Sequence, residues 1–161
     1  YNLVGCQTHL KFGEQKRVFS MIPALRNAEF VRYGVMHRNT FLDSPRLLDA
    51  TYALKSEPRI RFAGQMTGVE GYIESTASGW TAGVAAAMEV LGRPMPQLDR
   101  FTAVGALASY ISDHTVTKFQ PMNINFGIIE PLGYKIKGKR EKNAKISERA
   151  LERIESLKGE L

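Results

Sequence analysis

The chain of 161 residues contains a single cysteine, Cys6. This scarcity excludes a disulfide within the chain and any metal site built from several thiolates. The three histidines, His9, His37 and His114, have no metal-ligand spacing, so no metal ion is expected. No apolar run approaches the roughly 18–20 residues that cross a bilayer, so no membrane partner is expected either. A cytoplasmic location is the simplest interpretation of the low cysteine content.

The sequence also lacks the G-x-G-x-x-G motif, the loop that binds pyrophosphate in dinucleotide-binding domains. If the chain belongs to a dinucleotide-binding protein, that loop lies outside it. The chain begins at Tyr1 without Met, directly in a strand-like run, so we expect a fragment of a longer protein. Its apolar content of 43% and charged content of 24% are ordinary for a globular protein.

What the sequence does contain is a conspicuous glycine-rich stretch at residues 59–87, RIRFAGQMTGVEGYIESTASGWTAGVAAA. A short apolar run breaks at Gly64, a loop follows to Gly71, and a long segment of small residues comes next. This pattern predicts a strand, a glycine turn and a helix. Backbone N–H groups at such a helix start are unpaired and can face a phosphate or another polar ligand. An ordinary strand-to-helix connection of an α/β domain has the same spacing, so both interpretations stay open.

The rest of the chain predicts alternating strands and helices. We expect strands over residues 1–10, 27–33, 50–55 and 59–63, and helices over residues 13–22, 71–92, 102–111 and 143–157. Thr102 is a plausible N-cap. Residues 118–134 are irregular but apolar, which predicts an extended arm laid across the protein surface. Gly79 and Gly83 lie four apart on one helix face, which suggests the close approach of another backbone.

Few residues offer chemistry. Cys6 lies in an apolar strand, so a buried inert thiol is favoured over a reactive one. The sequence His37-Arg38-Asn39-Thr40 places four hydrogen-bonding groups in a row, which suits either an anionic or heteroaromatic ligand or the capping of a turn. Tyr72, at the mouth of the glycine loop, can stack on a planar ring.

The net charge of +6 comes almost entirely from residues 135–145. Six cations stand there against Glu141 alone, giving a local charge of about +5. The six are Lys135, Lys137, Lys139, Arg140, Lys142 and Lys145. Such a cluster is either a contact for phosphates or a solvated helix start, the latter being the commoner case.

Four stretches carry a resemblance to a known family. The block FAGQMTGVEGYIESTASG at residues 62–79 resembles the second flavin-contact segment of the folate- and FAD-dependent tRNA (uracil-5-)-methyltransferases, the TrmFO family. In shorter form it is also similar to the related GidA/MnmG tRNA-modifying flavoproteins. The stretches LVGCQTHLKFGEQKRVF, FVRYGVMHRNTF and KFQPMNINFGIIEPL resemble the TrmFO family specifically.

The resemblance implies the C-terminal part of such an enzyme. The implied reaction passes a methylene group from 5,10-methylenetetrahydrofolate, by way of reduced FAD, to C5 of a uridine in the tRNA T-loop, with NAD(P)H as a further co-substrate. The pyrophosphate loop and the catalytic cysteines would lie in the N-terminal half of the same polypeptide. No catalytic residue is therefore assigned in this chain, and Cys6 is interpreted as a packing substitution.

The resemblance also implies site residues. One wall of the FAD site would consist of Gly64, Gln65, Met66, Thr67, Gly68 and Val69, with Tyr72 near the isoalloxazine. His37, Arg38 and Asn39 would face the substrate cleft, and the six cations listed above would contact the tRNA backbone.

The implied fold is α/β: the C-terminal portion of a Rossmann-like FAD-binding domain plus the end of an inserted α+β domain. Residues 1–58 would end the inserted substrate domain, and residues 59–161 would return to the FAD-binding domain with a basic C-terminal helix. Two alternatives remain, a wobble-uridine-modifying flavoprotein of the GidA/MnmG type and a non-catalytic nucleic-acid-binding module. An apolar face that covers the absent N-terminal half would be exposed in this chain, so self-association is also expected.

Overall fold

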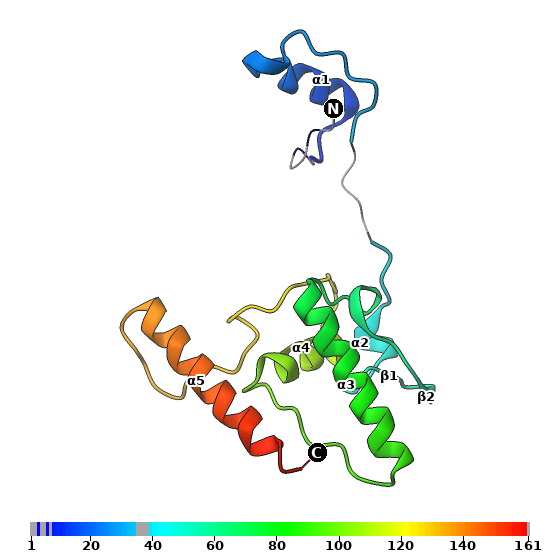
Figure 1. The fold of residues 1–161 in the computed structure, drawn as a ribbon, viewed down its shortest axis with the longest axis vertical. Coiled ribbons are helices and arrows are strands. Elements are labelled where there is room, and N and C mark those ends of the chain that lie inside the picture. Colours follow the sequence, from blue (N-terminus) through cyan, green and yellow to red (C-terminus); the bar gives the residue numbers. More distant parts are fainter. Residues whose placement is uncertain (1–2, 4–5, 7, 35–38, 161) are drawn as a thin grey trace. The chain divides into compact units, whose positions relative to one another are not determined.

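The computed structural model describes residues 3, 6, 8–34 and 39–160. Figure 1 shows the path of the chain, which divides into two compact units, Tyr1–Asn39 and Thr40–Leu161. No helix among the described residues is long and apolar enough to span a membrane.

The described residues contain five α-helices, two 3₁₀ turns and one β-hairpin. The first unit contains α1 (Phe12–Phe19) and the 3₁₀ turn η1 (Pro23–Leu25). The second contains α2 (Ser44–Leu47), β1 (Ala53–Leu54), β2 (Glu57–Arg61), the 3₁₀ turn η2 (Gly64–Thr67), α3 (Tyr72–Val90), α4 (Ala103–Ser112) and α5 (Lys139–Leu157). The fold is thus mixed and mostly helical, with a small two-stranded antiparallel sheet.

The first unit is held by aromatic stacking and by the hydrogen bonds of one buried amide. Phe30 stacks on both Phe19 and Tyr33, with ring centroids 5.8 and 5.5 Å apart. The side chain of Gln15 is buried in α1 and donates to the carbonyls of Leu10 and Gly34, both at 2.8 Å. These bonds tie the segments before and after the helix to one another.

The second unit has its main core between α4, α3 and the segment around α2. Leu48, Tyr52, Val69, Leu107 and Ile111 are almost fully buried there. Burying side chains of this size stabilises the unit by about 1.5–3 kcal/mol each. A smaller cluster, formed by Ala106, Ile129 and Ile146, lies where α5 meets α4 and the preceding segment.

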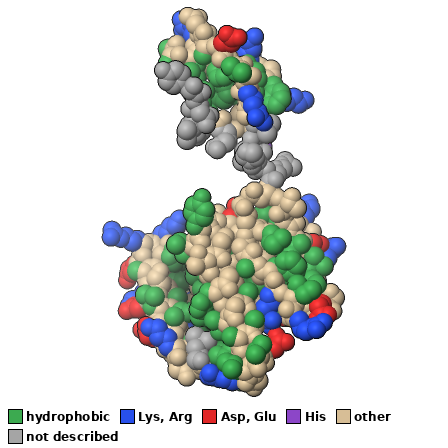
Figure 2. Space-filling model, turned by 45° about the vertical axis from the view of Figure 1, so that its right-hand side comes forward, with side chains coloured by type: hydrophobic (Ala, Val, Ile, Leu, Met, Phe, Trp, Pro, Cys, Tyr) green, Lys and Arg blue, Asp and Glu red, His purple; other side chains and the backbone are tan. Residues whose placement is uncertain are grey.

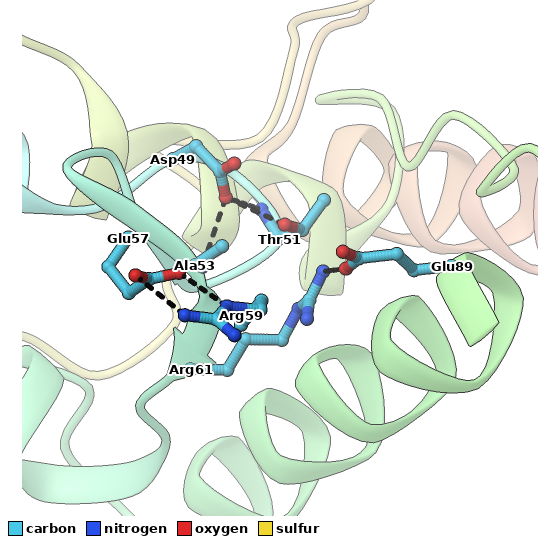
Figure 3. A network of polar contacts seen from close by, with 7 residues as sticks. All are labelled: Asp49, Thr51, Ala53, Glu57, Arg59, Arg61 and Glu89. Carbon is cyan, nitrogen blue, oxygen red and sulfur yellow. Dashed lines mark hydrogen bonds and ion pairs between the residues drawn. The ribbon is translucent and has the colours of Figure 1, made fainter.

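The hairpin is fixed by a carboxylate and by an ion pair to α3, both shown in Figure 3. Asp49 Oδ1 accepts hydrogen bonds from the amide and hydroxyl of Thr51, both at 2.7 Å, and from the amide of Ala53 at 3.1 Å. These bonds hold a turn in which Tyr52 has a φ of +62°. At the other strand, the guanidinium of Arg61 pairs with Glu89 at 2.5 Å, which joins β2 to the last turn of α3.

Several expected elements are present. The two strands around residues 50–63, the long glycine-rich helix and the helix after Thr102 are confirmed, and the Thr102 hydroxyl accepts from the Gly105 amide at 3.0 Å. The strand expected over residues 27–33 is wrong: these residues have no strand and instead supply aromatic rings to α1. The last helix begins at Lys139, four residues earlier than expected.

The expected mixture of helix and strand is therefore confirmed only in its coarse form. The described residues form no parallel sheet beyond the isolated bridge between Val69 and Met122. The strand expected over residues 1–10 falls partly outside the described residues, and the part described, residues 8–10, is irregular. The division at residue 58 stays a prediction.

Candidate functional site

The glycine loop between β2 and α3 has a conformation that only glycine adopts easily. Gly64, Gly68 and Gly71 all have positive φ, at +69°, +84° and +99°. Glycine takes up such angles without the steric penalty that a Cβ brings. The loop begins as the turn η2, in which the Thr67 hydroxyl donates to the Gly64 carbonyl at 2.7 Å. It then turns sharply into α3.

Neighbouring segments hold the loop from three sides. The Ser78 hydroxyl of α3 accepts from the Gly64 amide at 2.8 Å, and the Ser44 hydroxyl of α2 donates to the Thr67 carbonyl at 2.8 Å. On the third side, Met122 exchanges backbone hydrogen bonds with Gly68 and Glu70, at 3.0 and 3.1 Å. Such bracing fixes the loop before any ligand arrives.

The third side is the apolar arm expected over residues 118–134. Its Phe119 ring is buried against Phe41 and Tyr110, with centroids 5.9 and 5.5 Å away. A Cβ added to Gly68 would lie 2.3 Å from the Phe119 ring. Gly68 is therefore required both by its backbone angle and by this close packing.

The side chains of the loop divide into buried and exposed ones. Thr67 and Val69 are fully buried, so they can offer a ligand only backbone groups. Gln65 and Met66 reach the surface. Tyr72, the first residue of α3, is 94% exposed, which leaves both faces of its ring accessible.

The start of α3 has one carboxylate, that of Glu74, in its first turn, beside the N-cap residue Gly71. Its N-cap, Gly71, makes no side-chain hydrogen bond to the helix. Among the described residues, no group accepts from the amides of Tyr72, Ile73 and Glu74, the first three of the helix. The Glu74 carboxylate instead accepts from the Ile124 amide at 3.2 Å. Glu74 already complements the helix dipole at this end, so the unpaired amides offer hydrogen-bond donors to an electron-rich ligand rather than a site for a further anion.

The other expected cleft residues are only partly described. His37 and Arg38 lie outside the described residues. Asn39 is exposed at the end of the first unit. The expectation that these three residues face a cleft beside the loop stays a prediction. Cys6, a free thiol, is half-buried.

The basic cluster lies on the approach to α5 and on its first two turns. All six cations are exposed. Lys145 pairs with Glu148 at 2.6 Å, and this contact raises the pKa of the Lys145 ammonium. For the other five, the described residues supply no carboxylate partner.

The position of two of these cations is electrostatically unfavourable. Lys139 and Arg140 occupy the first turn of α5, where the helix dipole is positive. The interaction of a side-chain charge with the helix dipole is typically about 0.3–1 kcal/mol, and at this end it is unfavourable for a cation and favourable for an anion. In the described residues no group accepts from the first three amides of α5 either. The cations and the amides together form a site of concentrated positive potential.

A cleft of about 840 Å³ lies elsewhere in the second unit, near the segment between α3 and α4. Its charged groups have partners in the described residues, although the buried Nε of Arg149 has none. Asp99 pairs with Arg153 at 2.8 Å, and Arg149 lies over the Phe101 ring while donating to two backbone carbonyls. The cleft therefore offers less unsatisfied polar chemistry than the loop.

The sequence did not identify the residues that brace the loop. Ser44, Ser78 and Met122 act from distant positions through backbone and hydroxyl contacts. Only the unusual apolarity of the arm around Phe119 indicated that it packs on the protein.

Comparison with known proteins places the chain in a family. The model described as Glucose inhibited division protein A matches residues 1–94, more than half of the chain. The chain belongs to this family. The resemblance to TrmFO is also confirmed, because several relatives that carry this name align over nearly the whole chain.

Three of these relatives illustrate the extent of the match. The Methylenetetrahydrofolate--tRNA-(uracil-5-)-methyltransferase TrmFO of Acetivibrio thermocellus is 60% identical over 151 residues, which is 94% of this chain and 35% of the relative. The proteins of the same name from Desulfitobacterium hafniense and Listeria monocytogenes are both 56% identical, over 98% and 100% of this chain and 36% and 37% of their own length. The chain thus spans just over a third of the length of these relatives.

Proposed function

We propose that the chain is part of a folate- and FAD-dependent tRNA (uracil-5-)-methyltransferase of the TrmFO type, in which it supplies one wall of the flavin site. The observation that carries the proposal is the open start of α3 beside the exposed ring of Tyr72, in a chain 60% identical to a TrmFO. The domain assignment proposed with it places residues 1–58 at the end of an inserted substrate domain and residues 59–161 in a Rossmann-like FAD-binding domain.

The loop fits the ring end of FAD. The glycines let a flat ligand approach the backbone, and the unpaired amides of α3 favour the electron-rich pyrimidine edge of a flavin. Gln65 and Met66 are exposed beside them, and Tyr72 can stack on a ring. Thr67 and Val69, being buried, would shape the wall from behind and not touch the cofactor with their side chains.

FAD, when bound, supplies the redox chemistry by which the one-carbon unit of methylenetetrahydrofolate becomes a methyl group. The residues of this chain orient the ring edge and keep the loop rigid. We assign none of them as nucleophile, acid or base. NAD(P)H would serve as a further co-substrate of the whole enzyme. In this proposal His37, Arg38 and Asn39 line the side of the cleft that receives substrate.

The tRNA would contact the positive site at the start of α5. Phosphate contacts supply most of the sequence-independent affinity of nucleic-acid-binding proteins. The exposure of the six cations and the two unfavourably placed charges at Lys139 and Arg140 support this role. The same observation favours a second candidate, a nucleic-acid-binding module without catalysis. A wobble-uridine-modifying flavoprotein is the third.

A chimera tests the proposal. The matched 151 residues of the Acetivibrio thermocellus TrmFO are replaced by the corresponding residues of this chain, which restores a polypeptide of TrmFO length. We expect the chimera to bind FAD and to methylate the T-loop uridine of tRNA. Tyr72→Ala should perturb the flavin absorption band, whereas Tyr72→Phe, which keeps the ring, should retain it. The chain alone should bind FAD weakly or not at all and be inactive.

Tyr134→Ala is the control for the flavin absorption band alone, because Tyr134 is an exposed aromatic residue in the segment before α5, next to the basic cluster. An unchanged flavin spectrum and turnover in Tyr72→Ala would remove Tyr72 from the site. Salt-sensitive tRNA binding by the chimera without flavin uptake would favour the nucleic-acid-binding module. Modification of a wobble uridine in place of the T-loop uridine would favour the third candidate.

A further inference from the structure

The outer face of α3 is free of charge along its whole length. At the 3.6-residue period of an α-helix, its exposed positions other than Glu89, which lies to one side of this face, fall within one arc of about 120°. They are Tyr72, Ile73, Thr76, Gly79, Trp80, Gly83, Ala87, Val90 and, one residue beyond the helix, Leu91. No other element crosses in front of α3 in Figure 1, and hydrophobic side chains reach the surface of this unit in the view of Figure 2.

The opposite face of α3 already contributes to the core. Ser78, Thr81, Ala82, Ala85 and Met88 are buried there. The two carboxylates of the helix are engaged away from the outer face, Glu74 with the Ile124 amide and Glu89 with Arg61. A helix that is apolar on both sides is normally buried on both sides. Val90, however, is 87% exposed and Trp80 45%.

Two glycines at the middle of this face have no function within the described structure. A Cβ added to Gly83 would meet no atom within 4 Å, and one added to Gly79 would meet only the Ala63 Cβ, at 4.0 Å. Neither has a positive φ. A helical glycine is less stable than alanine, so these two positions lower the stability of α3 without any visible gain. Their absent side chains would instead let another backbone approach α3 closely.

We propose that the outer face of α3 packs against the part of a TrmFO-length polypeptide that lies outside the region matched by this chain. The matched region accounts for only 35–37% of the relatives' length, so such a protein has ample chain to cover the face. A second copy of this chain is the alternative occupant, in keeping with the self-association expected from the sequence, and the test below distinguishes the two. The proposal rests on the similarity to TrmFO and not on the flavin site.

Oxidative footprinting of the isolated chain and of the chimera described above tests this packing. Hydroxyl radicals modify exposed Trp80 and Leu91, and mass spectrometry reads each residue separately. Both residues lie along α3 away from its open start, so a bound flavin does not protect them. We expect their oxidation to fall at least fivefold in the chimera, with or without FAD, while that of exposed Tyr134 stays unchanged.

Gly83→Ala gives a second readout that does not risk the fold. In the isolated chain the new methyl group has free space, so the melting temperature should rise. In the chimera the same methyl group should collide with the covering segment and lower it. Gly13→Ala is the matched control, because Gly13 is also a helical glycine with no atom within 4 Å of an added Cβ. It should raise the melting temperature of both proteins.

The outcomes separate the occupants. Equal oxidation in both proteins, or a stabilising Gly83→Ala in both, would overturn the proposal. Protection of Trp80 that grows with the concentration of the isolated chain, together with a doubled mass in light scattering, would assign the face to a second copy. Protection in a chimera that binds no FAD would support the packing and contradict only the proposed function.

Discussion

Gly68→Ala is the substitution that most directly tests how the loop is held. Gly68 has a φ of +84°, and an alanine there would adopt a left-handed conformation that costs about 1–2 kcal/mol. Its Cβ would also lie 2.3 Å from one ring atom of Phe119 and 2.6 Å from another. Overpacking of this kind typically costs about 1–3 kcal/mol. We therefore expect a loss of about 2–5 kcal/mol in the free energy of unfolding.

The Phe119 ring cannot simply move aside, because it is buried and wedged between Phe41 and Tyr110. Gly64→Ala separates the two contributions. Gly64 also has a positive φ, but the nearest atom to its added Cβ is 3.7 Å away. The Gly64→Ala variant should lose only the backbone contribution to the free energy of unfolding, about 1–2 kcal/mol. The difference between the two variants is the cost of the collision with the ring.

Urea unfolding followed by Trp80 fluorescence measures these losses, since Trp80 is the single tryptophan and lies in the same unit as the loop. With a denaturant slope of about 1–3 kcal/mol/M, the Gly68→Ala midpoint should fall by about 0.7–5 M. A loss below 1 kcal/mol, or equal losses in the Gly68 and Gly64 variants, would refute the argument. Phe119→Leu should recover part of the loss in a double variant, because it vacates the space that the methyl group needs.

Three further predictions concern other parts of the second unit. Thr102→Ala removes the N-cap of α4 and should cost about 1 kcal/mol in thermal unfolding, whereas Thr102→Ser should cost less. Burial raises the pKa of the Tyr52 phenol above its ordinary value of 10.0, so its contribution to stability is complete below pH 10 and is lost as the pH rises further. The free energy of unfolding should then fall by up to about 1.4 kcal/mol per pH unit, a slope that Tyr52→Phe removes. Replacing Lys139 and Arg140 together by Ala should weaken tRNA binding and reduce the slope of log K against log salt by about 1.4–1.8. Lys158→Ala, at the far end of α5, should leave this slope unchanged. Equal slopes in the double variant and the unaltered protein would show that the cluster does not contact tRNA phosphates.

Local signals predicted the second unit well because its elements are set by nearby residues. The hydroxyl of Thr102 and the stop after Gly92 fix their helices within one turn. The strand expected over residues 27–33 failed for the opposite reason. An alternation of apolar and charged residues suits a strand only if a partner strand is present, and Phe30 and Tyr33 instead stack on one another and on α1.

The candidate site was predictable only in part. The glycine spacing identified the loop, since glycine is required wherever φ is positive. Its supports could not be predicted, because Ser44 and Met122 reach it through contacts between residues far apart in the sequence. Nor does a sequence distinguish Thr67, whose side chain is buried, from the exposed Met66 beside it. That distinction decides which residues can touch a ligand.

The loop and the outer face of α3 meet at Tyr72, and this shared residue connects the two proposals. Stacking on a flavin ring requires one face of Tyr72 to be covered, while the structure leaves the side chain 94% exposed. The segment that packs on Gly79 and Gly83 would run along α3 toward this ring, so it is well placed to form the opposite wall of the site. The small residues that lower the stability of the helix would then serve to bring that wall close to the open amides at its start. If both proposals hold, the flavin site would extend outward from α3, and this chain would contribute the wall formed by the loop and Tyr72.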